Sequence, residues 1–487
     1  MADTDDFARQ QIRSGIAHLG GGAAAVRIID LLASLYVLRL LTEKDMGLAA
    51  LAGSVTIILE SLCGFGLRTS IVAAASIEPA ERDELIGFTA ITGLAFGLIA
   101  VASAWPLASV YQEPALAAMV AVSAVKLVLV SLTVVPQTLL ARDLAFRAVA
   151  GLQTLGAAAG AITKVGLAHW GLGAWALVWA NVLSAAAVLA GTWMVTWTGL
   201  PRLRFRFADV AWHVKFGARA ALSGLLTETS KNIDYFMVGL FLGVGPLGVY
   251  RVAFEMATTP LESIAQPIYR ATFSVFSRIS AERERLHQAF VEATRSMVAF
   301  TGPVAIVLYL ATGDLFAVVT KGGWEASVPA IRILCWAAFL RTVTRLFDNL
   351  FYARREPGMA LLDGVATFVL LALGVPLGLL AFGGEYGILV PCYVWLGTYP
   401  IVYGLLFAIA VRRGALVPAS YFRGIFPAVL ATLATLAVAV PLGWLSAGVE
   451  SSLARLAIVS GGAGLAYFLV VRYGVHLPLS FGGRPPA

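Results

Sequence analysis

Long apolar runs alternate with short polar segments along most of the chain. Each run is long enough for an α-helix to cross about 30 Å of hydrocarbon at a rise of 1.5 Å per residue. The runs are continuous in Leu, Val and Ala rather than alternating, so they do not predict the strands of a membrane β-barrel. We therefore predict 14 transmembrane helices, at residues 15–41, 46–73, 85–110, 116–140, 148–170, 173–198, 216–241, 247–276, 290–312, 328–352, 359–382, 386–411, 424–445 and 453–473.

Composition supports this pattern. The 487 residues are 59% hydrophobic and 13% charged, with a mean hydropathy of +0.84, whereas soluble domains average about 25% charged residues. The net charge of +7 does not indicate a nucleic-acid partner, because the basic residues lie in short loops or inside the helices. The cysteines, Cys63, Cys335 and Cys392, lie in apolar runs, so we expect buried free thiols. The predicted class is an all-α polytopic membrane protein.

Basic residues are distributed unequally between alternate loops. One set of loops and termini holds most of them, including Arg9, Arg82 and Arg412, and the opposite set holds Lys44, Lys321 and Arg455. Positively charged loops stay on the cytoplasmic side of a membrane. The sequence therefore predicts that both termini are cytoplasmic.

Two stretches of the sequence resemble each other at a fixed separation. The stretches are "ILESLCGFGLRTS", beginning at Ile58, and "PLESIAQPIYRAT", beginning at Pro260. When they are aligned, Glu60 matches Glu262 and Arg68 matches Arg270, each pair 202 residues apart (262 minus 60, 270 minus 68). The offset covers six helices, an even number, so the repeats run in the same direction across the membrane. We predict two parallel six-helix lobes around a central cavity, at residues 15–198 and 216–411, joined by a basic linker at residues 199–215. Two additional helices follow at residues 412–473. Cytoplasmic tails occupy residues 1–14 and 474–487.

Charged residues inside the predicted helices are the main functional signal. A charge at the centre of a bilayer costs about 2.5–3.5 kcal/mol, so it must face protein or a water-filled cavity. At 100° per residue, two helices place their polar residues on one face, within about 80°. These residues are Arg219, Ser223, Thr227, Ser230 and Asp234 in one helix and Arg251, Glu255, Thr258, Glu262 and Gln266 in the next. We also expect Glu228 to pair with Lys231, three residues away.

A cavity rich in guanidinium groups favours an anion, because arginine binds phosphate through two parallel hydrogen bonds and stays charged. The candidate substrate-binding residues are Arg27, Arg68, Arg219, Lys231, Arg251, Arg270, Arg341 and Arg345. For Arg68 and Arg270, extension to the inner lipid headgroups is an equal alternative. The candidate ion-coupling carboxylates are Asp30, Glu60, Asp234, Glu255 and Glu262; alternatively, they only neutralise the arginines.

Three stretches resemble the Wzx-type oligosaccharide flippase family, also called the polysaccharide transporter family. This family belongs to the multidrug/oligosaccharidyl-lipid/polysaccharide flippase superfamily. The stretches are "LYVLRLLTEKDMGLAALAGSVTIILESLCGFGLRTSIV", "VPQTLLARDLAFRAVAGLQTLGAAAG" and "NIDYFMVGLFLGVGPLGVYRVAFEMATTPLESIAQPIYRATFSVFSRI". The resemblance implies a two-lobed transporter of the bacterial inner membrane. Its substrate would be an undecaprenyl-pyrophosphate-linked oligosaccharide, moved from the cytoplasmic to the periplasmic leaflet for surface polysaccharide synthesis, with a polysaccharide polymerase or co-polymerase as a further partner.

Other functions remain open. A peptidoglycan-precursor (lipid II) flippase would need similar chemistry, and an ion-coupled drug exporter could share the fold. A polysaccharide polymerase or ligase is disfavoured because the outer segment at residues 313–327 is short, so we do not expect an enzyme. The glycines at Gly20, Gly21 and Gly22 are not followed by Lys-Ser or Lys-Thr, and we expect neither a nucleotide, a metal nor another cofactor. We expect a monomer.

Overall fold

The computed structural model describes residues 26, 29–74, 76–196, 207–320, 323–446 and 448–470, and within these ranges it contains helices and no strand. Ten helical segments of that part of the chain are long and apolar enough to cross a membrane. They are Glu43–Val72, Pro79–Val110, Pro114–Arg142, Trp175–Val195, Arg283–Thr320, Glu325–Ala353, Leu361–Tyr386, Leu389–Arg412, Pro418–Ser446 and Ser452–Leu469. The predicted all-α, multi-pass membrane fold is confirmed at this level.

Three further helices are long enough to cross a membrane but are more polar. They are α6 (Phe146–His169), α8 (Phe207–Leu242) and α9 (Val244–Arg278). α8 and α9 carry the polar faces expected from the sequence, which lowers their hydropathy. The exact number of 14 transmembrane helices stays a prediction.

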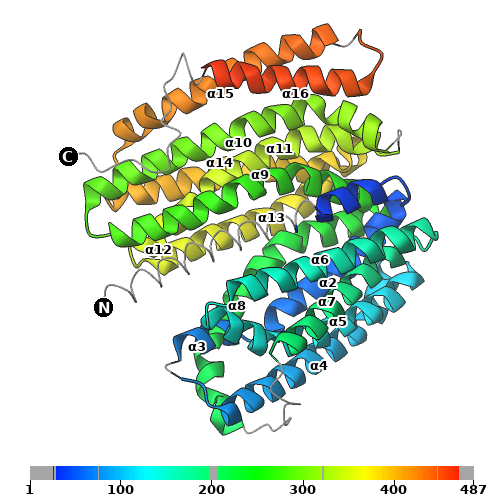
Figure 1. Cartoon of the computed structure of the whole chain (residues 1–487). Coiled ribbons are helices and arrows are strands. Elements are labelled where there is room, and N and C mark those ends of the chain that lie inside the picture. Colours follow the sequence, from blue (N-terminus) through cyan, green and yellow to red (C-terminus); the bar gives the residue numbers. More distant parts are fainter. Residues whose placement is uncertain are drawn as a thin grey trace. The chain divides into compact units, whose positions relative to one another are not determined.

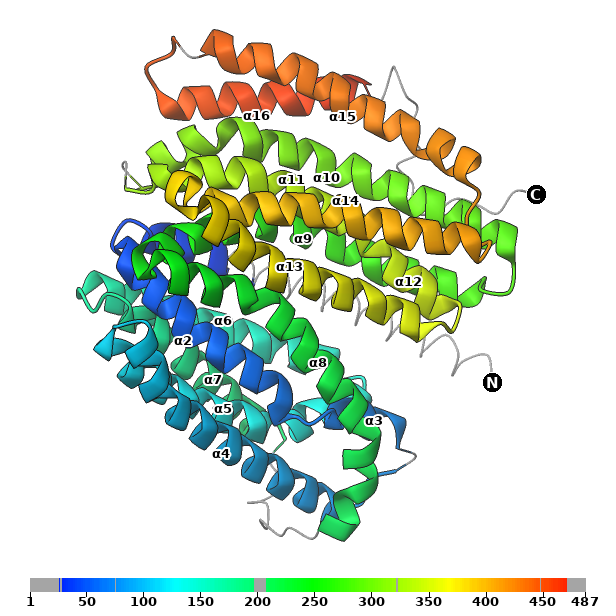
Figure 2. The same cartoon turned by 180° about the vertical axis from the view of Figure 1, so that it is seen from behind.

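The chain divides into two compact units, Met1–Gly248 and Val249–Ala487. In the first unit, α2 (Glu43–Cys63) packs against α4 (Pro79–Val110), α5 (Pro114–Arg142) and α8, while α6 packs against α7 (Trp175–Val195) (Figures 1 and 2). α8 thus belongs by contact to the first unit. The six-helix lobes at residues 15–198 and 216–411 remain a prediction from the sequence repeat.

The start of α2 is fixed by a local signal. Thr42 Oγ1 accepts a hydrogen bond from the Asp45 backbone N at 3.2 Å, and Asp45 Oδ2 accepts one from the Thr42 backbone N at 3.0 Å. This reciprocal capping satisfies two backbone donors that have no partner within the helix. It explains why the helix begins directly after Thr42.

The helix expected at residues 46–73 is interrupted. α2 ends at Cys63, and α3 (Leu67–Ala73) begins after a turn in which Phe65 and Gly66 have φ angles of 42° and 68°. Glycine tolerates this left-handed conformation, and a Cβ at Gly66 would overlap the backbone of Gly217 in α8. Glu60 and Arg68 therefore lie on separate helices, contrary to the expectation of one continuous helix.

A second expected helix, at residues 328–352, is also divided. It forms α11 (Val328–Thr344) and α12 (Leu346–Ala353), which are separated at Arg345. The division places Arg345 at a junction between two helices rather than within one.

A buried histidine fastens α8 to two other helices of the first unit. His213 is 2% exposed; its Nδ1 lies 2.9 Å from Ser70 Oγ of α3, and its Nε2 lies 2.9 Å from Glu81 Oε1 of α4. Buried polar groups are costly unless they are hydrogen-bonded, and both ring nitrogens have partners here. The contact fixes the beginning of α8.

The second unit is arranged around α10 (Arg283–Thr320). α10 contacts α11, α15 (Pro418–Ser446) and α16 (Ser452–Leu469), while α14 (Leu389–Arg412) packs between α11 and α13 (Pro357–Tyr386) (Figures 1 and 2). Phe290 of α10 packs in tilted contact with Phe347 and Tyr421, with ring centroids at 5.0 and 6.0 Å. The last two helices, α15 and α16, are therefore part of this packed unit.

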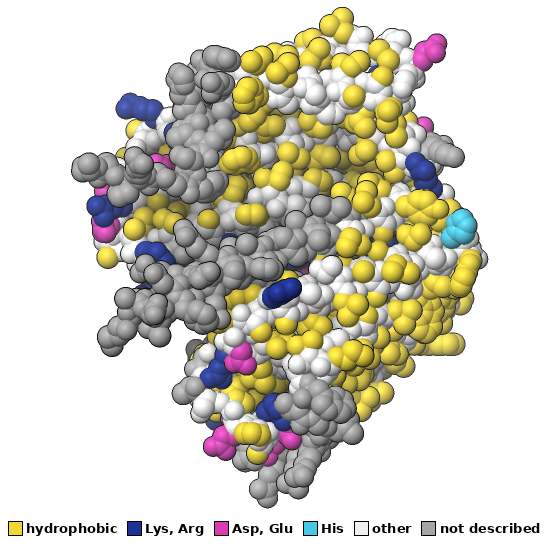
Figure 3. All heavy atoms as spheres, in the orientation of Figure 1, with side chains coloured by type: hydrophobic (Ala, Val, Ile, Leu, Met, Phe, Trp, Pro, Cys, Tyr) yellow, Lys and Arg dark blue, Asp and Glu magenta, His cyan; other side chains and the backbone are white. Residues whose placement is uncertain are grey.

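The outer faces of several helices are apolar. Leu94 and Leu98 of α4 and Leu377 and Leu380 of α13 are more than half exposed, and hydrophobic side chains cover much of the face seen in Figure 3. Exposed apolar side chains in such numbers are expected where the solvent is lipid rather than water. All three cysteines are buried and free, as predicted.

Candidate functional site

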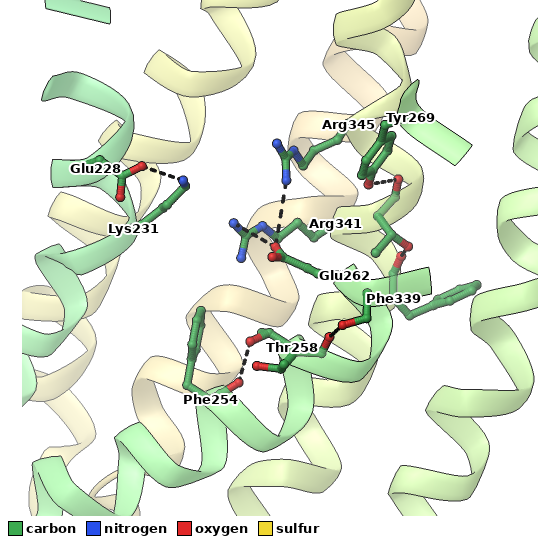
Figure 4. A network of polar contacts seen from close by, with 12 residues as sticks. Glu228, Lys231, Phe254, Thr258, Glu262, Tyr269, Phe339, Arg341 and Arg345 are labelled. Carbon is green, nitrogen blue, oxygen red and sulfur yellow. Dashed lines mark hydrogen bonds and ion pairs between the residues drawn. The ribbon is translucent and has the colours of Figure 1, made fainter. Parts of the chain in front are cut away.

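A cluster of charged and aromatic side chains lies inside the second unit (Figure 4). Arg341 of α11 forms an ion pair with Glu262 of α9, with Nη2 at 3.3 Å from Oε1, and Arg345 Nη1 lies 3.9 Å from the same oxygen. The Arg345 guanidinium lies 5.3 Å from the centre of the Tyr269 ring, and that of Arg341 lies 5.9 Å from the Trp395 ring. Aromatic faces stabilise cations at these distances. The cluster holds both guanidinium groups in fixed positions.

The same cluster contains further carboxylates. Asp348 of α12 and Asp363 of α13 lie close enough to Arg345 for an electrostatic interaction. Together with Glu262 they set three carboxylates beside two guanidinium groups. The charges of the cluster are therefore close to balanced. Of these three acids, only Glu262 is among the ion-coupling carboxylates predicted from the sequence; Asp348 is predicted to share a helix face with Arg341 and Arg345.

The first unit contains a comparable ion pair. Lys126 Nζ of α5 lies 2.8 Å from Glu60 Oε2 of α2. The pair borders a cavity of about 440 Å³ between α2, α3, α5 and α8. Its lining residues are Ile57, Glu60, Ser61, Gly64, Gly66, Arg68, Lys126, Val130, Val134, Ala221 and Glu228. Two predicted residues, Glu60 and Arg68, thus line one cavity although they lie on different helices.

The polar residues of α8 and α9 pair mostly within their own helix. Lys231 Nζ lies 2.8 Å from Glu228 Oε1, as predicted from their spacing, and Arg251 Nε lies 2.8 Å from Glu255 Oε1. Asp234 is fully buried, and its Oδ1 accepts a hydrogen bond from the Tyr235 backbone N at 2.9 Å. These residues belong to two different units, so the described contacts do not bring them into one site.

Other candidate residues lie apart from these clusters. Asp30 pairs with Lys164 of α6, Oδ1 to Nζ at 2.7 Å, and Lys164 also donates to Ser34 Oγ at 3.0 Å. Arg270 is exposed on α9 and forms no ion pair with a residue that the structure describes. Arg27 and the side chain of Arg219 lie outside the described residues.

Comparison with known proteins assigns the chain to a family. Residues 37–329 match the sequence profile of a family described as polysaccharide biosynthesis protein. The chain belongs to this family. The match covers more than half of the chain, including every described helix from α2 to α10.

Three named proteins are similar to this chain over most of their length. The lipopolysaccharide biosynthesis protein WzxC of Escherichia coli is 23% identical over 70% of this chain and 72% of its own. The teichuronic acid biosynthesis protein TuaB of Bacillus subtilis is 21% identical over 81% and 83%. The succinoglycan biosynthesis transport protein ExoT of Rhizobium meliloti is 24% identical over 74% and 71%.

Solved structures show the same fold at low identity. A structure of the lipid II flippase MurJ in an inward closed conformation has a TM-score of 0.72 and 10% identity, covering 93% of this chain and 98% of that one. An inward-facing transporter of the multidrug resistance MATE family, in the MOP superfamily, has a TM-score of 0.55 and 17% identity, covering 81% and 94%. The chain therefore shares its fold with these two transporters.

In this member of the polysaccharide biosynthesis protein family, both units contain the same kind of ion pair. Glu60 and Glu262 occupy equivalent positions of the sequence repeat, and each pairs with a basic residue two predicted helices later, Lys126 and Arg341. The acids are 202 residues apart, but the bases are 215 apart (341 minus 126). Because the two separations differ by 13 residues, aligning the sequence with itself at an offset of 202 does not match Lys126 with Arg341.

Sequence reasoning did not select Lys126 and Lys164 as site residues. Lys126 is the only charged residue in the apolar run "AMVAVSAVKLVLVSLTVV", beginning at Ala118. A single lysine inside a membrane helix requires a partner or water. That signal was present, but the partner could not be known before the packing of α2 against α5.

Proposed function

We propose that this protein transfers an undecaprenyl-pyrophosphate-linked oligosaccharide from the cytoplasmic to the periplasmic leaflet of a bacterial inner membrane. The oligosaccharide then enters the synthesis of a surface polysaccharide. The observation that carries this proposal is the family match over residues 37–329 of a multi-pass membrane chain. The relative named as a succinoglycan biosynthesis transport protein supports transport as the activity. Both termini lie in the cytoplasm in this proposal, because the basic loops do.

The charged clusters supply the chemistry that such a substrate requires. A diphosphate headgroup cannot cross hydrocarbon without compensation of its charge. Lys126 and Arg68 border an open cavity in the first unit, and Arg341 and Arg345 lie within the second. Arginine suits phosphate oxygens because its planar group forms paired hydrogen bonds. Alternating access of these groups to the two sides would carry the headgroup across.

The proposal is tested in a strain that lacks the protein. Lipid extracts analysed by mass spectrometry should contain an accumulated lipid-linked oligosaccharide, which disappears when the wild-type chain is restored. Accumulation of lipid II instead would assign the protein to peptidoglycan synthesis. Unchanged lipid-linked intermediates would exclude a role as a flippase.

Reconstitution tests the activity directly. Purified protein in liposomes should move a fluorescent lipid-linked oligosaccharide between leaflets, so that a membrane-impermeant quencher reaches both halves of the pool. Liposomes without protein should keep half of the signal protected. The same protection in the presence of protein would contradict the proposal.

A further inference from the structure

Resting on the proposed function, we propose that Glu60 and Lys126 form an exchangeable ion pair and that a phosphate group of the substrate replaces the Glu60 carboxylate on Lys126. The ligand class is a phosphate or diphosphate ester. The proposal adds Lys126 to the binding residues and gives Glu60 the role of an internal competitor.

The first observation is the accessibility of the pair. The Lys126 and Glu60 side chains are 20% and 30% exposed, and both border the cavity of about 440 Å³. This volume lies in the range of small-molecule sites, about 300–1,000 Å³. An anion entering the cavity therefore reaches the Lys126 ammonium without unfolding a helix.

The second observation is another cation beside the pair. Arg68 lines the same cavity, is exposed, and forms no ion pair with any residue in the described ranges. Its position after the turn at Gly64–Gly66 brings it to the same cavity as Lys126. Two cations on one cavity can hold the two phosphates of a diphosphate, Lys126 as a point charge and Arg68 through its fork of donors.

The third observation is the contrast with the equivalent pair of the second unit. There, Glu262 lies near two arginines, and the Arg341 side chain is 11% exposed and lies over Trp395. In the first unit, one lysine holds Glu60 through a single contact. Lysine has no planar fork to lock the carboxylate in place. Exchange is therefore easier at Glu60 than at Glu262.

An anion in the cavity competes with the Glu60 carboxylate for Lys126. The cavity lining carries the carboxylates Glu60 and Glu228 and the cations Arg68 and Lys126. Glu228 is held by Lys231 at 2.8 Å, outside the competition for Lys126. Neutralising Glu60 would leave Lys126 free for phosphate and should strengthen its binding.

The test measures the affinity of the purified full-length protein for inorganic pyrophosphate and for farnesyl diphosphate by isothermal titration calorimetry. Glu60→Gln should bind both about three- to tenfold more tightly, the range expected when a competing ion pair of about 0.7–1.4 kcal/mol is removed. Lys126→Met should bind about tenfold more weakly, and Arg68→Gln should also lose affinity. A change confined to farnesyl diphosphate would assign the site to the lipid headgroup rather than to free phosphate.

Matched controls lie on the same two helices. Lys44 Nζ of α2 lies 2.6 Å from Glu113 Oε1 at the start of α5, away from the cavity. Lys44→Met and Glu113→Gln should leave both affinities unchanged. The double variant Glu60→Gln/Lys126→Met avoids an unpaired charge, and it should lose the gain of Glu60→Gln.

Unchanged affinity for both ligands in Glu60→Gln and Lys126→Met would overturn the exchange site. So would equal effects in the Lys44 and Glu113 controls. Neither result depends on flipping, because binding to purified protein is measured. A deletion strain without accumulated lipid-linked oligosaccharide would instead overturn the proposed function and leave the binding result standing.

Discussion

Arg455 of α16 is ion-paired with Asp314 near the end of α10, with Nε and Oδ1 2.6 Å apart. Arg455 also donates from Nη1 to the Val449 carbonyl oxygen at 2.7 Å and from Nη2 to Ser452 Oγ at 3.1 Å. Both charged side chains are less than one-third exposed. One residue thus fastens the last helix and the preceding turn to the second unit.

Loss of this contact should loosen α16. Arg455→Ala or Asp314→Asn should lower the free energy of unfolding by about 1.5–3 kcal/mol, the usual value of a hydrogen bond to a charged group. The decrease is measured as a lower thermal midpoint in detergent. The double variant Arg455→Ala/Asp314→Asn should lose less than the sum of the single losses. Additive losses would show that the two residues do not interact.

α2 packs closely against the first turn of α9, so we predict that Gly248 in this turn cannot be replaced by a larger residue. A Cβ at Gly248 would overlap the Glu43 carbonyl oxygen. We expect Gly248→Ala to force the helices apart and to lower the yield of monodisperse protein in size-exclusion chromatography. Gly53→Ala on α2 is the control, because nothing lies within 4 Å of its added Cβ, and alanine favours a helix by about 0.5–1 kcal/mol. Equal yields from both variants would contradict this packing.

The contacts of His213 predict a stabilising role. His213→Phe keeps the ring volume but removes the contacts with Ser70 and Glu81, at a cost of about 1–3 kcal/mol for buried groups left without partners. Thermal unfolding should shift down by several degrees. His169→Phe at the exposed end of α6 is the matched control and should have no effect. An unchanged midpoint for His213→Phe would exclude this role.

The cluster around Glu262 predicts residue-specific effects on transport. Arg341→Ala should abolish polysaccharide export from a complemented deletion strain, and Arg341→Lys should restore it only in part, because lysine lacks the planar fork. Arg332→Ala is the control on the same helix, since Arg332 lies 6.0 Å from the Tyr309 ring and outside the cluster. Membrane levels are compared by immunoblotting. Normal export by Arg341→Ala would refute a role for this cluster in transport.

The energy source is testable in proteoliposomes. Asp30, Glu60, Glu255 and Glu262 each pair with a cation at 2.7, 2.8, 2.8 and 3.3 Å. The charge of each of these carboxylates is therefore already balanced by a neighbouring cation. We therefore expect equal flipping rates with and without an imposed pH gradient. A faster rate with the gradient would support proton coupling through one of these acids.

The sequence alone determined the membrane class and the local contacts. Continuous apolar runs can be stable only as helices in lipid, because every backbone polar group must be paired inside the segment. The pair of Glu228 and Lys231 followed from a three-residue spacing, since helix geometry places such residues side by side. Fourteen helices were predicted on the same grounds, and the described part of the chain supports membrane-spanning helices without fixing that number.

Only the tertiary structure decided which distant charges meet. Glu60 pairs with Lys126, and Asp30 pairs with Lys164, across 66 and 134 residues (126 minus 60, 164 minus 30). Helix periodicity gives the face on which a charge lies but not the helix that covers that face. The break at Gly66 likewise depends on the backbone of Gly217, which approaches from another helix. Non-local packing chose these partners, because a charge in a membrane can be satisfied by any neighbouring helix that brings its counter-charge to the same depth.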